Sequence, residues 1–225
     1  VVGRHVFASV QSLHAERLAQ DVPPTAFHMV IVDEFHHAAA ATYDRLLDHL
    51  QPEILLGLTA TPERADGKSI LGHFDGRVAA ELRLWTALDR QLLVPFHYFG
   101  VADTVDLSGV SWRGGYVAKE LENVYTANDL RVGLVLKELR RRVADVGAMR
   151  AVGFCVGVAH AEFMATRFEA AGVRSAAFHG GLSSEARKAT LDDFRAGRIQ
   201  ALFAIDIFNE GVDVPEIDTI LFLRP

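Results

Sequence analysis

The sequence has little of several features that would point to particular classes of protein. Cys155 is the single cysteine among 225 residues, which excludes an internal disulfide and a Cys-x-x-Cys metal site and fits a reducing compartment. No apolar run is long enough to cross a bilayer, and no secretory signal is visible. We therefore expect a cytoplasmic protein without a membrane segment.

An excess of positive charge is also missing. The chain carries 23 Lys and Arg against 29 Asp and Glu, a formal net charge of −6. Residues 1–92 hold 8 basic and 12 acidic side chains, residues 93–126 hold 2 and 4, and residues 127–225 hold 13 and 13. A surface that binds a polyanion must therefore be a local patch rather than a field spread over the whole protein.

Apolar runs and amphipathic segments alternate in the first part of the chain. Residues 5–8 and 54–58 are predicted strands, and the unbroken apolar run 27–32 indicates a strand buried on both faces. Tyr43, Leu46, Leu47 and Leu50 have the spacing of one apolar helix face. Strands that alternate with helices are typical of a parallel sheet covered by helices.

This alternation stops near residue 93 and resumes near residue 128. The stretch between is rich in glycine and contains Trp112, Arg113 and Tyr116, and we interpret it as a hairpin or connector. Its aromatic side chains could stack on bases, although a Trp in a connector more often packs against a domain face.

A second alternation follows, starting with Asn128 as the cap of an amphipathic helix. Strands are predicted at residues 151–155, 174–178, 200–205 and 219–223, and Gly172 and Gly197 end the helices between them. The predicted fold class is α/β, with two parallel-sheet lobes in tandem at residues 1–92 and 127–225, joined by an irregular connector at residues 93–126.

Asp33 and Glu34 directly follow the strand predicted at residues 27–32. The carboxyl ends of parallel strands are where open α/β sheets bind ligands. There, an Asp can hold a hydrated magnesium ion while a Glu accepts a proton from an attacking water. Carboxylates also favour the start of a helix for electrostatic reasons alone, so this segment by itself leaves both interpretations open.

Polar residues follow the other predicted strands as well. In the first lobe they are Ser9 with Gln11 and Thr59 with Thr61; in the second they are His179-Gly180-Gly181 and the segment 206–213. Polar turns at the carboxyl ends of parallel strands in two lobes indicate a ligand held between the lobes.

The order of these segments resembles a known family. Val32-Asp33-Glu34-Phe35-His36-His37, Leu58-Thr59-Ala60-Thr61-Pro62-Glu63-Arg64, Phe178-His179-Gly180-Gly181 and residues 206–215 resemble, in order, motifs II, III, IVa and V of superfamily 2 helicases. These motifs resemble the form found in type III restriction enzyme helicase subunits, and residues 9–13 resemble that group's motif Ib. The resemblance covers nearly the whole chain and implies two RecA-like lobes.

The resemblance also implies roles for individual residues. Asp33 would hold Mg²⁺ through water, and Glu34 would orient and deprotonate the water that attacks the γ-phosphate of ATP. The other implied roles are coupling by His36, His37, Thr59 and Thr61; nucleotide binding by Gly211 and Asp213; and nucleic-acid binding by Ser9, Gln11, Cys155, His179, Gly180 and Asp206.

The implied partner is nucleic acid, DNA ahead of RNA. Flanking domains or a nuclease partner are compatible with the family, and the oligomeric state is left open.

The sequence departs from the family pattern in three places. Ile205 stands where motif V often opens with Thr, and Glu210 stands where many relatives have Arg. No GxxxxGK[ST] loop is present: Gly67-Lys68-Ser69 imitates its end, but Pro62 occupies the position of the first Gly. The arginines of motif VI are expected beyond Pro225. We therefore expect both lobes to be truncated, as the middle of a longer motor, and inactive alone.

Two other functions remain open on the sequence. The chain could be a non-catalytic module of helicase fold that binds nucleic acid or protein, although a decayed site has no physical reason to keep two carboxylates at a strand end. It could also be a metal-dependent hydrolase that uses Asp33, Glu34, His36 and His37, although their spacing matches neither HExxH nor HxxEH.

Overall fold

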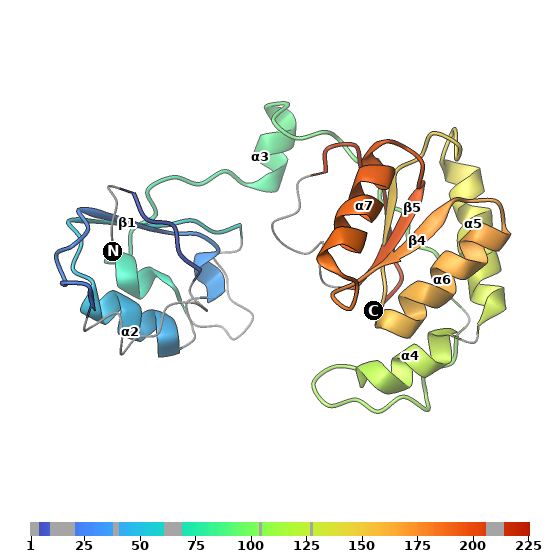
Figure 1. Ribbon diagram of the computed structural model, residues 1–225, viewed down its shortest axis with the longest axis horizontal. Coiled ribbons are helices and arrows are strands. Elements are labelled where there is room, and N and C mark those ends of the chain that lie inside the picture. Colours follow the sequence, from blue (N-terminus) through green and yellow to red (C-terminus); the bar gives the residue numbers. More distant parts are fainter. Residues whose placement is uncertain are drawn as a thin grey trace. The chain divides into compact units, whose positions relative to one another are not determined.

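The computed structural model describes residues 5–9, 21–37, 41–60, 69–103, 105–126, 128–205 and 214–225. The chain divides into two compact units, Val1–Phe96 and His97–Pro225, and Figure 1 labels several of their elements. In the described parts of the chain, no helix has both the length and the apolar character that a membrane span requires.

The first unit contains a pair of parallel strands, β1 (Met29–Val32) and β2 (Ile54–Gly57), connected through α2 (Ala41–His49). The register places Met29 beside Ile54 and Val32 beside Gly57. Val30 and Val32 pack in a cluster with Leu47 of α2, and Val30 also packs against a second cluster that contains Leu46. Two short 3-10 helices, η2 (Phe35–His37) and η3 (Leu71–Phe74), and α3 (Leu84–Asp89) complete the described elements.

Two expectations for this unit are wrong. Met29 and Ile31 of β1 are 45% and 57% exposed, so the strand is not buried on both faces; α2 covers the Val30 side only. Residues 5–8 are not a strand: residues 6–9 are irregular, and Phe7 is 98% exposed. A strand needs a neighbour to satisfy its backbone groups, and no described strand pairs with this segment.

The second unit is built on a fully parallel sheet in the order β4-β5-β3-β6. The strands are β3 (Ala151–Phe154), β4 (Ser175–Phe178), β5 (Ala201–Ala204) and β6 (Thr219–Phe222). The helices are α4 (Ala118–Thr126), α5 (Asp129–Arg142), α6 (Val158–Ala170) and α7 (Ser184–Arg195). Within this unit, α7 lies on one side of the sheet, and α5 and α6 lie on the other (Figure 1).

Local sequence signals set the ends of these helices. The Asn128 side chain accepts a hydrogen bond from the Arg131 amide at 2.9 Å, which confirms the predicted cap of α5. Gly172 and Gly197 follow α6 and α7 with φ of 83° and 77°, values that a glycine adopts without steric cost. The predicted glycine stops are therefore confirmed.

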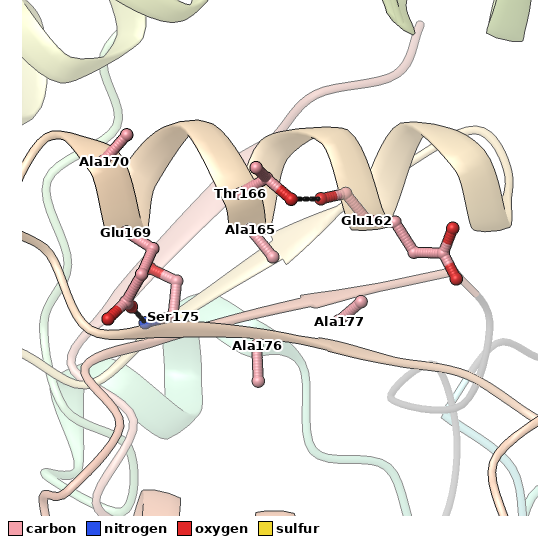
Figure 2. A pocket seen from close by; sticks show the side chains of 8 residues that line it. All are labelled: Glu162, Ala165, Thr166, Glu169, Ala170, Ser175, Ala176 and Ala177. Carbon is pink, nitrogen blue, oxygen red and sulfur yellow. Dashed lines mark hydrogen bonds between the residues drawn. The ribbon is translucent and has the colours of Figure 1, made fainter.

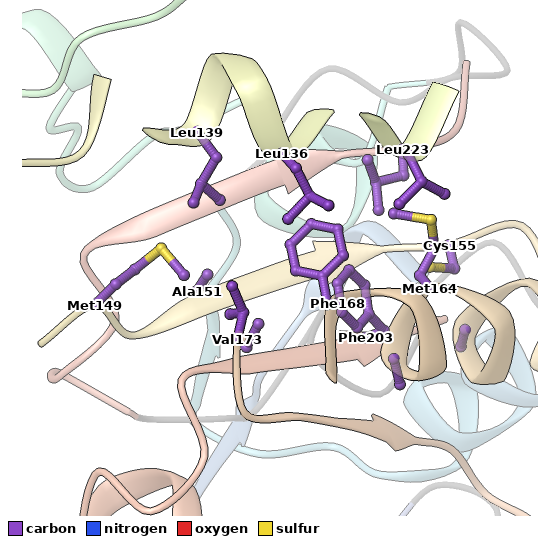
Figure 3. Packing of buried hydrophobic residues seen from close by; sticks show 14 residues of the cluster. Leu136, Leu139, Met149, Ala151, Cys155, Met164, Phe168, Val173, Phe203 and Leu223 are labelled. Atoms are coloured by element: carbon purple, nitrogen blue, oxygen red, sulfur yellow. The ribbon is translucent and has the colours of Figure 1, made fainter. Parts of the chain in front are cut away.

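The apolar core of the second unit has two parts because alternate strand residues face opposite sides of the sheet. Ala151, Ala201 and Phe203 face α5 and α6, where Phe168 and Phe203 pack edge to face at 4.8 Å, as Figure 3 shows. Val152, Leu202 and Ala204 belong to the opposite cluster, with Phe194 of α7. Two parallel α/β sheets, one in each unit, confirm the predicted fold class.

Residues 93–126, predicted as an irregular connector, contain one regular element, α4. An isolated antiparallel bridge joins Trp112 to Tyr116 just before this helix. Asp103 accepts a hydrogen bond from the Arg131 side chain of α5 at 2.6 Å. These contacts attach the later part of the stretch to the second unit. The division into residues 1–92, 93–126 and 127–225 stays a prediction.

Candidate nucleotide and nucleic-acid site

The candidate site of the first unit forms where β1 and β2 end side by side. The Leu58 amide donates to the Val32 carbonyl at 2.9 Å, and the Phe35 amide donates to the Leu58 carbonyl at 2.8 Å. The backbone of Asp33 and Glu34 lies between these two hydrogen bonds. Both carboxylates are consequently held at the carboxyl edge of the parallel pair, where a ligand can reach them.

The buried side chain of Phe35 supports the carboxyl edge of the β1–β2 pair. Its side chain is fully buried and packs edge to face against Phe74 with ring centroids 4.7 Å apart. A side chain at Gly57 could not be accommodated, because a Cβ there would lie 2.5 Å from the Phe74 ring and 3.0 Å from the Phe35 ring. Sequence reasoning missed these positioning residues; a glycine inside an apolar strand was the available signal.

Glu34 adopts an unusual backbone conformation, with φ of 48° in the left-handed region. Its amide donates to Asp33 Oδ1 at 2.9 Å. Non-glycine residues rarely occupy this region, and they cluster at functional sites when the surrounding fold holds them there. Here the buried Phe35 on one side and the β1–β2 ladder on the other hold Glu34 in place.

His36 connects the two strand ends. Its Nδ1 lies 3.0 Å from Thr59 Oγ1 and 3.3 Å from Glu34 Oε2. Because an ionised carboxylate can only accept a hydrogen bond, the approach of Glu34 requires a proton on Nδ1. The structure thus brings Glu34, His36 and Thr59, three of the predicted residues, into one cluster.

Asp33 has the chemistry that a magnesium ion requires. It is exposed, and the Glu34 amide engages one of its oxygens. Magnesium usually binds one or two carboxylates while it keeps several waters or substrate phosphate oxygens. A single accessible carboxylate fits that role. Among the described side chains, no three acidic, His or Cys groups are close enough to form a protein-only metal site; the His37 side chain, part of the metal-dependent hydrolase alternative, is not among them.

Cys155, His179 and Gly180, the described predicted residues of the second unit, lie at the ends of β3 and β4. His179 is 9% exposed; its Nδ1 accepts a hydrogen bond from the Gly181 amide at 3.2 Å, and its Nε2 lies 3.7 Å from Glu162. Gly180 is exposed. Both positions are compatible with a turn that contacts the phosphate backbone of nucleic acid.

The expected contact of the Cys155 side chain with nucleic acid is wrong. Cys155 is fully buried, and burial raises the pKa of its thiol to about 12. The thiol is therefore a small apolar group of the core at neutral pH.

Glu122 of α4 is a site residue that the sequence did not reveal. Its carboxylate accepts hydrogen bonds from the Ala159 amide at 2.9 Å and from Lys119 at 3.0 Å, so it supplies the cap that Gly157 cannot give α6. Burial raises the pKa of Glu122, but these hydrogen bonds outweigh burial and leave the pKa below its ordinary value. The carboxylate fastens α4 to the carboxyl edge of the sheet.

His160, in the first turn of α6, makes the second unit sensitive to acid. It is fully buried, and burial, helped by the nearby Arg131, lowers its pKa to about 4. Between pH 6.5 and 4, this histidine therefore binds a proton more readily in the unfolded chain than in the folded one. The contribution of neutral His160 to the free energy of unfolding is fully present above pH 6.5 and is lost as the pH falls toward 4.

We expect the free energy of unfolding to drop by on the order of 3 kcal/mol from this group across that range. His160→Gln should remove most of the drop in urea titrations at pH 7 and pH 4. His28→Gln is the control, because the His28 side chain is 67% exposed. Equal acid sensitivity in wild type and His160→Gln would contradict this explanation.

A groove of about 510 Å³ lies between α6 and β4, and Glu162, the neighbour of His179, is among its lining residues. Figure 2 shows two hydrogen bonds among the residues that line it. The Glu169 carboxylate accepts from the Ser175 amide at 2.8 Å, and the Thr166 hydroxyl donates to the Glu162 carbonyl at 2.8 Å. Much of the remaining lining is alanine, which provides no catalytic group.

Several predicted residues lie outside the described residues: Gln11, Thr61, Asp206, Gly211 and Asp213. The backbone of His37 belongs to η2, but its side chain is not described. Ser9 is described and exposed.

Comparisons with known proteins give two family matches along the chain. The family described as type III restriction enzyme, res subunit, matches residues 2–64, and the helicase conserved C-terminal domain matches residues 135–225. A 51.5 kDa protein of Lactococcus phage (isolate 7-9) is 25% identical over 197 residues, which cover 88% of this chain and 42% of the phage protein.

Irc3 of Schizosaccharomyces pombe, whose name designates a mitochondrial ATP-dependent helicase, is 27% identical over 225 aligned residues, 95% of this chain and 35% of Irc3. The helicase domain of Pyrococcus furiosus Hef aligns with a TM-score of 0.48 at 15% identity, covering 96% of this chain and 69% of that one. The chain thus spans about two fifths or less of the length of the two curated relatives.

The fold and the site define a two-part α/β protein with paired carboxylates at the end of a parallel strand. The two matching families follow each other along the chain in the order of a helicase core. The two family matches, together with the likeness to Irc3, support a superfamily 2 helicase of the type III restriction enzyme kind.

Proposed function

We propose that the full-length protein is a nucleic-acid-stimulated ATP hydrolase, a helicase or translocase that acts on DNA in preference to RNA. Residues 1–92 and 127–225 are then parts of its two motor lobes, and residues 93–126 connect them. The observation that carries the proposal is the cluster of Glu34, His36 and Thr59 at the adjoining ends of two parallel strands. A cytoplasmic location is part of the same proposal.

Glu34 is positioned to act as the general base. Its left-handed backbone directs the carboxylate out of the ladder, and Asp33 beside it would hold magnesium through water. A bound magnesium ion supplies charge neutralisation to the phosphates in phosphoryl transfer. The protein's own contribution is to fix the base by the buried Phe35 and by the contact with His36, so that little reorganisation precedes proton transfer.

His36 and Thr59 provide a route from the catalytic base to the neighbouring strand end. A ligand that shifts the segment after β2 would move Thr59, and the 3.0 Å contact with His36 would carry the shift to Glu34. Nucleic acid is the ligand proposed to do this, with Ser9, His179 and Gly180 on its path. Gln11, Thr61, His37, Asp206, Gly211 and Asp213 keep their proposed roles on the sequence alone.

The experiment that tests the proposal is ATP hydrolysis by the purified full-length protein, measured alone and with single-stranded DNA, duplex DNA and RNA of equal length. Stimulation by DNA above that by RNA is the expected result. Stimulation by RNA alone would contradict the preference for DNA. An absence of hydrolysis with all three would contradict the enzyme assignment and would favour a binding module of the same fold.

A further inference from the structure

A short hairpin in the second unit projects two aromatic side chains that no part of the proposed function uses. Trp112 and Tyr116 form an isolated antiparallel bridge. The Arg113 amide donates to the Gly115 carbonyl at 2.9 Å, and the Val117 amide donates to the Ser111 carbonyl at 3.0 Å. Gly114, at the tip, has φ of 79°. The backbone therefore closes a tight turn with Arg113 directly before the tip.

The aromatic pair presents an open ring surface. The two rings pack edge to face, with centroids 5.1 Å apart and an interplanar angle of 89°. An edge-to-face partner can cover at most one face of the indole ring. Trp112 is 67% exposed and Tyr116 is 37% exposed. The interpretation that such a Trp packs against a domain face does not hold for Trp112.

Two carboxylates fasten the hairpin to the body of the unit. Glu120 of α4 accepts from the Ser111 amide at 2.6 Å and from the Ser111 hydroxyl at 3.2 Å. The Ser111 hydrogen bonds hold the pKa of Glu120 below its ordinary value. Glu122, two residues further along α4, caps α6 through the Ala159 amide. These hydrogen bonds hold in place the turn that bears the exposed Trp112 ring. Less conformational entropy is then lost when a ligand binds the ring.

We infer that Trp112 is a stacking platform for a base of single-stranded nucleic acid, with the Arg113 guanidinium beside the adjoining phosphate. Every base has a flat face that matches an open indole, and Arg113, the next residue along the chain, supplies one cation for the one charge that each nucleotide carries. A protein partner would instead be expected to use a ring enclosed in a patch that excludes water, whereas this ring projects from a glycine turn. The inference rests on the proposed function, because it assigns part of that function's nucleic-acid surface.

The chain contains two tryptophans, which allows a direct test. Trp85 of α3 is 71% exposed and is the matched control. Binding of the chain to fluorescein-labelled oligo(dT) and oligo(U) is measured by anisotropy. We expect Trp112→Ala to weaken binding by about tenfold, within the range for loss of one stacked base. Trp112→Phe should recover most of the affinity, and Trp85→Ala should bind as wild type does.

Intrinsic fluorescence separates stacking from a general loss of affinity. In Trp85→Phe, the remaining Trp112 should be quenched on titration with unlabelled oligonucleotide, and in Trp112→Phe, the remaining Trp85 should not. Thermal melts verify that the variants fold; Trp112 is exposed, so its removal should leave the melt unchanged.

Equal affinity of wild type and Trp112→Ala, with Trp112 unquenched, would overturn the inference and leave protein binding as the use of the exposed ring. If this result accompanied ATP hydrolysis by the full-length protein that nucleic acid stimulates, only the inference would fail. If the wild-type chain bound no oligonucleotide and the full-length protein were not stimulated, the inference and the proposed function would fail together.

Discussion

Glu34→Gln in the full-length protein is expected to retain ATP binding and to lose nucleic-acid-stimulated hydrolysis by about 10²- to 10⁴-fold, the contribution of a positioned general base. The amide keeps the size and most of the hydrogen bonding of the carboxylate but cannot accept the proton of the attacking water. The contact with His36 Nδ1, now 3.3 Å, can be kept by the amide oxygen. The loss should therefore fall on turnover rather than on affinity.

The measurement is steady-state hydrolysis with saturating single-stranded DNA, beside a direct nucleotide-binding titration. Glu53→Gln is the matched control: Glu53 lies at the start of β2 in the same unit, and its side chain is 78% exposed. The control should hydrolyse ATP at the wild-type rate. Wild-type turnover by Glu34→Gln would remove the base assignment.

The second large effect concerns the 225-residue chain by itself, which we expect to fold and to hydrolyse ATP no faster than background. Nucleotide affinity in such motors comes mainly from backbone amides and a lysine around the phosphates, and these 225 residues contain no GxxxxGK[ST] loop. Loss of a transition-state arginine alone costs about 10³- to 10⁵-fold in related systems. Asp33 and Glu34 can bind a metal but cannot hold a triphosphate in place.

The test compares ATP hydrolysis by the 225-residue chain and by the full-length protein, each with and without DNA. Circular dichroism verifies that the short chain is folded. The decisive control is Glu34→Gln in the short chain. Activity that the short chain shows and that this substitution removes would mean that groups other than a phosphate-binding loop hold the nucleotide.

Much of the second unit could be predicted because its signals are local. A cap such as Asn128 and stops such as Gly172 and Gly197 act within a few residues of the helix ends that they set. Unbroken apolar runs likewise predicted the parallel strands. These local signals could not predict the strand order β4-β5-β3-β6, because the order depends on contacts between segments far apart in the chain.

The candidate site also combines features that the sequence predicted with features that it could not predict. Asp33, Glu34, His36 and Thr59 could be proposed because they follow strands, but neither the left-handed backbone of Glu34 nor the packing of its neighbour Phe35 against Phe74 could be predicted from local sequence. Glu122 caps α6 from a different helix, and no spacing in the sequence relates Glu122 to Ala159. The burial of Cys155 also depends on tertiary packing, so a side chain at a strand end was mistaken for a contact.

The central claim is that Glu34, His36 and Thr59 act as one unit that connects nucleic-acid binding to hydrolysis. A double-mutant cycle tests it most directly: DNA-stimulated ATP turnover is measured in the full-length protein for His36→Ala, Thr59→Val and the double variant. Each single change should lower stimulated turnover by about tenfold, in line with the loss of one hydrogen bond. Because both changes break the same 3.0 Å contact, the double variant should be no slower than the slower single variant. Losses that multiply, giving a double variant about a hundredfold slower than wild type, would contradict the claim that these residues form one unit.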